Sequence, residues 1–227
     1  VCIRATRTDW RDMTDRVVVL GAGYAGAGAV KRLSSELGRD ADLVWVSETD
    51  HHLVLHESHR VVRDRSVADD VTIPVEDVAP GAEFRQGTVD DVDVDDQVVE
   101  LEGGDTVDYD WLLVCLGSKT AYYGIPGLEE NAHTLKCLDD AISIHEDVTA
   151  AAQSATQQDP ATVVVGGAGL SGIQTAGEVA EFRDHNDAPI DVYLVEALEE
   201  IFPGNDESVQ TALRKRLNAA DVSIKTD

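Results

Sequence analysis

The sequence of 227 residues is short of cysteine, of long apolar runs and of basic side chains, and each shortage excludes a class of protein. The three cysteines, Cys2, Cys115 and Cys137, are odd in number and show no CxxC spacing, which argues against a disulfide framework and a dithiol redox pair. No apolar run reaches the roughly 18 residues of a membrane-spanning helix. The first 15 residues also lack the apolar core of a secretory signal. We therefore expect a soluble protein of a reducing cytoplasm.

The shortage of basic residues is the strongest compositional fact, because 18 of them face 44 acidic residues and the net charge is −26. Such a charge repels nucleic acid and anionic membranes. Its self-repulsion opposes compaction unless salt in the molar range cuts the screening length to about 3 Å. A disordered acidic tail would also explain the charge, but the carboxylates are spread among apolar strands. The composition therefore favours a halophilic cytoplasm and excludes nucleic acid as a partner.

Apolar residues make up 43 % of the chain, and their pattern repeats one arrangement twice. Residues 16–50 have the pattern of a strand, a glycine turn, a helix and a second strand, and the same βαβ order restarts at Thr162. Between these units, residues 71–118 alternate in short segments, which predicts a small antiparallel meander that returns to the parent sheet through the apolar stretch 111–117. A turn-rich crossing and a helix then lead to Pro160.

These changes of pattern divide the chain into four parts. We expect a disordered leader over 1–13, a first domain over 14–118, a crossover segment and helix over 119–160, and a second, incomplete domain over 161–227. Both domains have the order of a Rossmann-like, three-layer α/β fold, with the meander in the first.

The two glycine turns have the sequences GAGYAG, at 21–26, and GAGLSG, at 167–172. Each fits GxGxxG between an apolar strand and a helix, the context in which this motif binds a dinucleotide. The first glycine permits the tight bend, the second lets a pyrophosphate approach, and the third allows close packing of the helix. These glycines are Gly21, Gly23 and Gly26 in the first turn, and Gly167, Gly169 and Gly172 in the second.

An acidic residue follows each turn at the end of the next strand: Glu48 lies 22 residues past the last glycine of its turn, and Glu196 lies 24 residues past. A carboxylate there accepts hydrogen bonds from ribose hydroxyls. Two such sites explain the repeat if one holds FAD and the other admits a nicotinamide, so that hydride passes between them. Glu196 repels a ribose 2′-phosphate and residues 197–207 contain no Arg or Lys, which favours NADH over NADPH. Glycine-rich bends with a purely structural role are the alternative.

The sequence resembles the flavoprotein reductases with two dinucleotide domains, and most of all the type II NADH dehydrogenases, which oxidise NADH and reduce a quinone. The likeness covers residues 14–227. The crossing at 124–141 is its most specific part, since other reductases share the glycine turns but not this segment. The stretches that carry the resemblance are VVVLGAGYAG (17–26), YDWLLVCLGS (109–118), GIPGLEENAHTLKCLDDA (124–141), VVVGGAGLSGIQTAGEVAE (163–181) and VYLVEALEEIFPG (192–204).

The resemblance implies FAD at the first turn, NADH at the second, and a quinone as electron acceptor. It places Val89 near the adenine, Gly117 at the flavin pocket and Glu178 on the helix that lines the nicotinamide side. The residues implied for FAD are Gly21, Gly23, Gly26, Glu48, Val89 and Gly117, and those implied for NADH are Gly167, Gly169, Gly172 and Glu196.

The sequence also departs from the family. Gln174 stands two residues past the last glycine, where the family usually has Glu, and an amide cannot transfer a proton. Cys115 and Leu116 replace the first two residues of an ATG-like turn, and HHLVLHESHRVV at 51–62 replaces the usual loop near the flavin. Family members continue well beyond this length, with a second flavin segment, the quinone site and an amphipathic membrane anchor. The chain therefore looks like the N-terminal portion of such an enzyme, and association with the inner face of a membrane would need the missing part.

Two weaker patterns leave alternatives open. His52, His56 and His59 would cluster on a helix, but the segment follows a strand, so a loop or solvated histidines are favoured over a metal site, and the role of the stretch 51–59 stays open. Cys137 lies where the related sulfide:quinone oxidoreductases carry a sulfur-handling cysteine, although a small apolar residue at a buried turn is the simpler interpretation.

Three functions therefore compete. The favoured one is hydride transfer from NADH to FAD and onward to a quinone. The second is a sulfide:quinone or ferredoxin-type reductase of the same fold, and the third is a non-catalytic remnant that binds a dinucleotide. No interface pattern decides the oligomeric state, and a homodimer is compatible with the sequence.

Overall fold

The computed structural model describes residues 2–4, 14–38 and 40–227 and divides the chain into two compact units. Unit 1 comprises Val1–Val54 and Thr72–Lys119, and unit 2 comprises Leu55–Val71 and Thr120–Asp227. The segment Leu55–Val71 thus belongs to unit 2, although unit 1 precedes and follows it in the sequence. None of the helices in the described ranges is both long enough and apolar enough to span a membrane.

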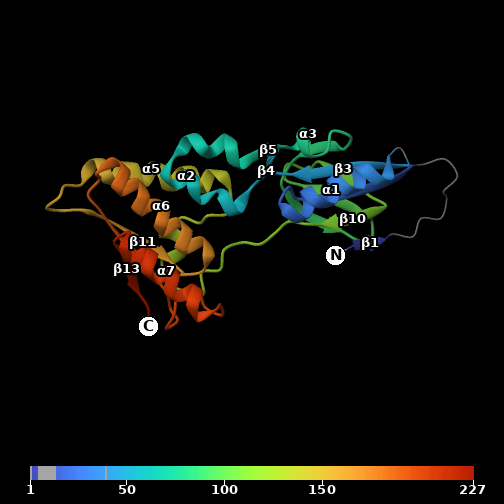
Figure 1. The fold of residues 1–227 in the computed structure, drawn as a ribbon. Coiled ribbons are helices and arrows are strands. Elements are labelled where there is room, and N and C mark those ends of the chain that lie inside the picture. Colours follow the sequence, from blue (N-terminus) through green and yellow to red (C-terminus); the bar gives the residue numbers. More distant parts are fainter. Residues whose placement is uncertain (1, 5–13, 39) are drawn as a thin grey trace. The chain divides into compact units, whose positions relative to one another are not determined.

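Unit 1 is built on a five-stranded sheet in the order β1-β10-β2-β3-β6 (Figure 1). β2, β3, β6 and β10 run parallel, and β1 pairs antiparallel with β10. The main elements are β1 (Cys2–Arg4), β2 (Asp15–Leu20), α1 (Tyr24–Leu37), β3 (Ala41–Ser47), β6 (Glu83–Gln86) and β10 (Trp111–Val114). β1 falls within the predicted leader, whose residues 1 and 5–13 lie outside the described residues.

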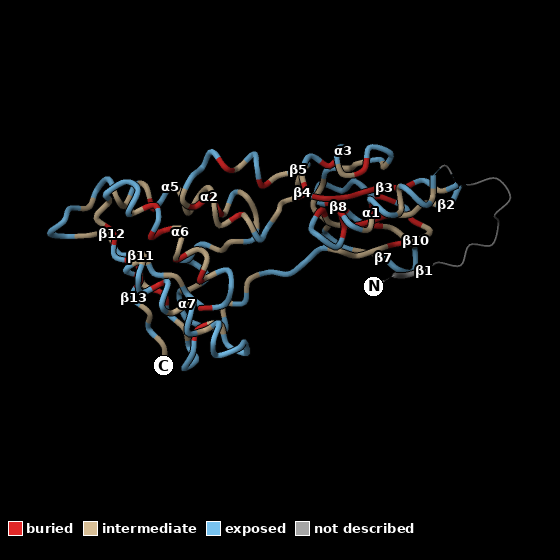
Figure 2. Tube along the Cα trace, viewed as in Figure 1, coloured by how far each residue is buried: buried red, intermediate tan, exposed pale blue. Residues whose placement is uncertain are grey.

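Both faces of this sheet are covered. On one face Val19 and Trp45 pack with α1 and with α3 (Val75–Val78), which follows a short ribbon of β4 (His51–Leu53) and β5 (Thr72–Pro74). On the other face lies an antiparallel meander of β7 (Val89–Asp93), β8 (Val98–Leu101) and β9 (Thr106–Asp108). Figure 2 shows β3 as a largely buried strand between these layers.

The predicted meander is confirmed with one correction, because Glu83–Gln86 pairs with β3 in the parent sheet rather than with the meander. The chain leaves the parent sheet at Gly87, whose N–H donates to the carbonyl of Ser47 at 2.9 Å. A Cβ at position 87 would press against the side chain of Leu101 in β8, at 2.9 Å. Glycine therefore allows the sheet and the meander to approach closely, and it separates two strands that the sequence pattern joined.

Unit 2 has a three-stranded parallel sheet in the order β11-β12-β13. Its longer elements are α5 (Leu138–Ser154), β11 (Ala161–Gly166), α6 (Leu170–Asn186), β12 (Ile190–Val195), α7 (Glu207–Ala219) and β13 (Val222–Lys225). Its short elements are η1 (Leu55–Glu57), α2 (His59–Arg63), η2 (Arg65–Val71) and α4 (Leu128–Asn131). Both predicted βαβ units are therefore present, and the fold is of the α/β class.

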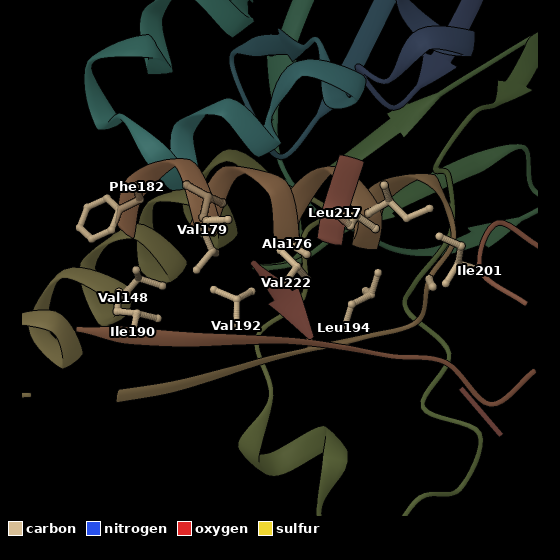
Figure 3. Packing of buried hydrophobic residues seen from close by; sticks show 14 residues of the cluster. Val148, Ala176, Val179, Phe182, Ile190, Val192, Leu194, Ile201, Leu217 and Val222 are labelled. Atoms are coloured by element: carbon tan, nitrogen blue, oxygen red, sulfur yellow. The ribbon is translucent and has the colours of Figure 1, made fainter. Parts of the chain in front are cut away.

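The core of unit 2 lies between α6 and one face of the sheet. Figure 3 shows Ala176 and Val179 of α6 directed towards Val192 and Leu194 of β12. Val62 belongs to the same cluster and is fully buried, because α2 packs against α6 and α5. The segment Leu55–Val71 is thus part of the core of unit 2.

The opposite face of this sheet is open within unit 2. Gly21 N–H donates to Val46 in unit 1 and Gly167 N–H donates to Val195 in unit 2, so these two pairs occupy equivalent positions. Val18 and Val46 are 0 % exposed beneath the meander, whereas Val164 is 61 % and Val195 39 % exposed. The two units therefore share a strand and helix arrangement but differ in the second covering layer.

Candidate functional site

The first glycine turn connects β2 to α1 and needs glycine at two of its positions. Gly21 has a φ of +99°, and a Cβ there would overlap the carbonyl oxygen of Cys115 at the end of β10. A Cβ on Gly26 would overlap the carbonyl oxygen of Gly21. The first glycine therefore makes the bend, and the third brings α1 against it.

The second turn connects β11 to α6 with the same geometry. Gly167 has a φ of +90° and donates its N–H to Val195 at 2.7 Å, as Gly21 donates to Val46 at 2.7 Å. A Cβ on Gly172 would overlap the carbonyl oxygen of Gly167. The close contact between the third glycine and the first thus recurs in both turns.

The middle glycines, Gly23 and Gly169, face open space. A Cβ at either position would meet no atom within 4 Å, and their φ angles of −70° and −72° are open to any residue. Each is the N-cap of its helix and makes no side-chain capping bond, so the first amides of α1 and α6 lack a capping side chain. Unsatisfied amides and the positive end of the helix dipole favour a phosphate. The space and the donors at both turns fit a dinucleotide pyrophosphate.

Glu196 is fixed beside the second turn. Its Oε2 accepts from the N–H of Ala168 at 2.7 Å, and its Oε1 accepts from the N–H of Leu198 at 3.1 Å. A carboxylate oxygen can accept more than one hydrogen bond, so Glu196 keeps capacity for hydroxyl donors. The backbone therefore holds this carboxylate at the turn in the position that a ribose diol requires.

Glu48 is not the positional equivalent of Glu196. Glu196 directly follows Val195, whereas Ser47 stands between Val46 and Glu48. Glu48 is exposed, and its backbone carbonyl accepts from Nε2 of Gln86 in β6 at 2.9 Å. The first turn therefore has its acidic residue one position further along the chain than the second.

The other residues expected at the first site lie on two different elements. Gly117 follows β10 with a φ of +76°, two residues after Cys115, whose carbonyl lies against Gly21. Val89 begins β7 and is half-buried against the apolar cluster beneath the meander. The end of β10 thus borders the first turn directly, and Val89 belongs to the meander.

Gln174 and Glu178 lie one turn apart on α6, and Glu178 is tied to α2. Glu178 Oε2 lies 3.2 Å from Nη1 of Arg63, and Oε1 lies 3.7 Å from Nε2 of His59. Burial raises the pKa of Glu178, with Arg63 opposing the shift, and burial also lowers the pKa of His59. The sequence placed Glu178 on the correct helix but gave no sign of this contact.

Sequence reasoning missed two ring donors at the first turn. Nε1 of Trp45 donates to the carbonyl of Gly21 at 3.0 Å, and Nδ1 of His52 lies 2.7 Å from the carbonyl oxygen of Ala22. His52 is in unit 1, whereas His56 and His59 are in unit 2. Within the described ranges, no three His, Cys, Asp or Glu side chains are grouped to hold a metal ion.

Cys137 caps α5. Its Sγ accepts from the N–H of Asp140 at 3.4 Å, and Oδ2 of Asp140 accepts from the N–H of Cys137 at 3.3 Å, which completes a capping box. Burial raises the pKa of this thiol. A protonated thiol that caps a helix fits a structural role, since the nucleophilic form of cysteine is the thiolate.

Known proteins share this sequence and this geometry. The chain is 32 % identical over 174 residues to the type II NADH:quinone oxidoreductase of Staphylococcus haemolyticus, a match that covers 73 % of this chain and 43 % of that protein. The structure of NDH2 from Plasmodium falciparum in complex with NADH superposes with a TM-score of 0.76 at 18 % identity, over 94 % of this chain and 48 % of that one. The sulfide:quinone oxidoreductase of Aquifex aeolicus gives 0.75 at 17 %, over 93 % and 51 %.

The chain thus spans less than half the length of the curated relative that it matches. The model of the pyridine nucleotide-disulphide oxidoreductases matches residues 15–227, which include both glycine turns. The chain therefore belongs to this oxidoreductase family, which uses FAD and NADH as cofactors.

Proposed function

We propose that this chain binds FAD at the turn of unit 1 and NADH at the turn of unit 2, and passes hydride from NADH to FAD within an NADH:quinone oxidoreductase. The observation that carries the proposal is the duplicated turn, in which the first and third glycines are required by the backbone and the middle one faces open space. One such turn would serve a single dinucleotide. Two of them, in a chain that resembles NADH:quinone oxidoreductases, support the two-cofactor reaction.

The residues of the chain would bind and orient the two dinucleotides. The N-terminal amides of α1 and α6 would donate to the pyrophosphates, with the helix dipoles favouring their charge. Bound FAD supplies the hydride acceptor that no amino-acid side chain can provide. The assignment gives Gly21, Gly23, Gly26, Glu48, Val89 and Gly117 to FAD, and Gly167, Gly169, Gly172 and Glu196 to NADH.

The anchored carboxylate of Glu196 supports NADH as the nucleotide of unit 2. Ala168 N–H and Leu198 N–H fix its two oxygens beside the turn, where it would accept from the ribose hydroxyls. A 2′-phosphate in that place would meet a fixed negative charge. Gln174 would contribute no proton transfer, and hydride transfer needs none from the protein, because it depends on the positioning of the two rings.

A quinone is proposed as the acceptor in preference to sulfide as a donor substrate. The quinone rests on the curated relatives, which are named as NADH:quinone oxidoreductases. Sulfide chemistry would require a reactive thiolate, and Cys137 instead caps α5 with a raised pKa. Quinone reduction, membrane contact and dimer formation are proposals for the whole enzyme, of which this chain spans less than half.

The visible absorption spectrum of the chain, purified in molar salt, tests the proposal. The expected result is a flavin band that bleaches when NADH is added without oxygen, and that responds much less to NADPH. A chain that takes up no flavin even when FAD is supplied would contradict the assignment of unit 1. A bound flavin that NADH does not reduce would contradict the proposed hydride transfer.

A further inference from the structure

The carbonyl of the alanine between the first two glycines is held in place in both turns, by different donors. In unit 1, Nδ1 of His52 lies 2.7 Å from the carbonyl oxygen of Ala22, 30 residues away. In unit 2, the backbone N–H of Phe202 donates to the carbonyl oxygen of Ala168 at 2.7 Å. The residues that supply the two bonds are unrelated, but they fix the same peptide group of the motif.

That peptide group joins the alanine to the middle glycine. In a trans peptide the C=O and the N–H point in opposite directions, and the chain has no cis peptide among its described residues. A bond that holds the carbonyl of Ala22 towards His52 therefore turns the N–H of Gly23 away from it. The same relation holds for Phe202, Ala168 and Gly169 in unit 2. Both arrangements orient the amide of the glycine that borders the open space.

His52 is built into unit 1 as a rigid donor. The residue is 6 % exposed and lies in β4, where its backbone pairs with Ile73 of β5. The ring meets the ring of Tyr24, the first residue of α1, edge to face at 4.9 Å between centroids. Because a carbonyl oxygen can only accept, the proton of this hydrogen bond resides on Nδ1. His52 thus contacts the turn on one side and the start of α1 on the other.

We infer that His52 is a positioning residue for the dinucleotide site of unit 1: it holds the carbonyl of Ala22 so that the amide of Gly23 faces the pyrophosphate. Unit 2 achieves the same with the backbone of Phe202. The inference rests on the proposed function, since the ligand of this turn is FAD in that proposal. It gives a role to one histidine of the stretch 51–59 whose purpose the sequence left open.

The test compares three variants of the full chain in molar salt. His52→Phe keeps a planar ring but removes the donor, and His52→Asn restores an N–H near the position of Nδ1. His51→Phe is the matched control, because His51 is the neighbour in β4 and its Nδ1 bonds to Asp50 instead of to the turn. Two readouts are needed: hydrogen exchange of the backbone amides at 21–24, and the affinity for FAD from flavin fluorescence.

The expected result is that His52→Phe speeds exchange at 21–24 and weakens FAD binding, each about tenfold, which is the effect of losing one buried hydrogen bond. His52→Asn should recover most of both effects, and His51→Phe should change neither. In wild-type chain the ¹⁵N resonance of Nδ1 of His52 should be that of a protonated nitrogen. Wild-type values of both readouts in His52→Phe, or no rescue by His52→Asn, would overturn the inference.

The two readouts separate failure of this inference from failure of the proposed function. If wild-type chain binds no FAD, the proposed function fails for this chain. Hydrogen exchange at 21–24 then decides on its own whether His52 sets the geometry of the turn. If FAD binds and the exchange rates at 21–24 are the same in wild type and His52→Phe, the proposed function stands and the role of His52 is overturned.

Discussion

The two glycine turns share one backbone path but are held in place differently. In unit 1 the carbonyls of Gly21 and Ala22 meet two ring donors, Trp45 and His52, which belong to neighbouring strands. In unit 2 the N–H and the carbonyl of Ala168 bond to Glu196 and to the backbone of Phe202, which follow β12. The motif therefore specifies the bend, and residues outside the motif fix its orientation.

The sheets behind the turns differ in the same way. Val18 and Val164 occupy equivalent strand positions, yet the meander covers the first and the second is 61 % exposed. The same residue type in the same local structure therefore contributes differently to stability, because burial depends on the layer above the strand. Four predictions use this pairing of the units, in order of expected effect.

The largest effect is expected where both turns require glycine. Gly26→Ala and Gly172→Ala should each lower the free energy of unfolding by about 3 kcal/mol, because the new methyl group would overlap a backbone carbonyl. Gly28→Ala and Gly177→Ala are matched controls on the same helices, where a Cβ meets nothing within 4 Å. These controls should gain about 0.5–1 kcal/mol. Denaturant unfolding measures all four, and tolerance of Ala at 26 or 172 would refute the close packing.

A second pair of variants tests the two covering layers. Val18→Thr should cost about 1–3 kcal/mol of unfolding free energy, since it buries a hydroxyl beneath an apolar meander. Val164→Thr should change the same quantity by less than about 0.5 kcal/mol, because this position faces outward. Equal losses in the two variants would mean that the face of the unit 2 sheet carrying Val164 is covered in solution.

The third prediction concerns pH. Burial raises the pKa of Glu178 above its ordinary value of 4.5, so the folded chain binds this proton more tightly than the unfolded chain does. The wild-type chain should therefore gain stability as pH falls through the raised pKa towards 4.5. Glu178→Gln does not titrate, so its stability relative to wild type should rise with pH above 4.5 and then level off.

Unfolding free energies of wild type and Glu178→Gln between pH 4 and pH 8 measure this difference. Glu181→Gln is the control on the same helix, because Glu181 is exposed. Its stability relative to wild type should change little with pH. A Glu178→Gln difference that stays constant over the whole range would contradict the raised pKa.

The smallest effect is expected at Cys137. Cys137→Ala should lower the free energy of unfolding by about 1 kcal/mol through loss of the cap of α5, and Cys137→Ser should keep or improve it, since serine is a preferred N-cap. The raised pKa also predicts slow alkylation of the wild-type thiol near neutral pH. Rapid alkylation together with a harmless Cys137→Ala would restore a sulfur-handling role.

The sequence predicted those features that depend on residues close together in the chain. Both βαβ units, the glycine turns and the meander were found from periodicity and glycine spacing, because these patterns reflect local backbone geometry. The docking of Leu55–Val71 on unit 2 was not found, because apolar residues such as Val61 and Val62 indicate burial but not a partner. The bond between His52 and Ala22 spans 30 residues and leaves no local pattern.

The two acidic residues show the same limit. Glu48 and Glu196 have similar spacings from their turns, yet only Glu196 directly follows the strand residue that pairs with the first glycine. The segments between turn and strand differ in length by three residues, because Val46 lies 20 and Val195 lies 23 past the last glycine. Spacing alone therefore did not establish equivalence, and the backbone register did.

The central claim, two separate dinucleotide sites built on one motif, is tested most directly at the middle glycines. Gly23→Asp and Gly169→Asp place a carboxylate where a Cβ meets nothing, at an N-cap with an ordinary φ. Aspartate is a favoured N-cap, so both variants should be at least as stable as wild type while they repel a pyrophosphate. Equilibrium titrations with FAD and with NADH should show that Gly23→Asp loses only FAD and that Gly169→Asp loses only NADH. Unchanged binding in both variants, or loss of both ligands in either folded variant, would contradict the account.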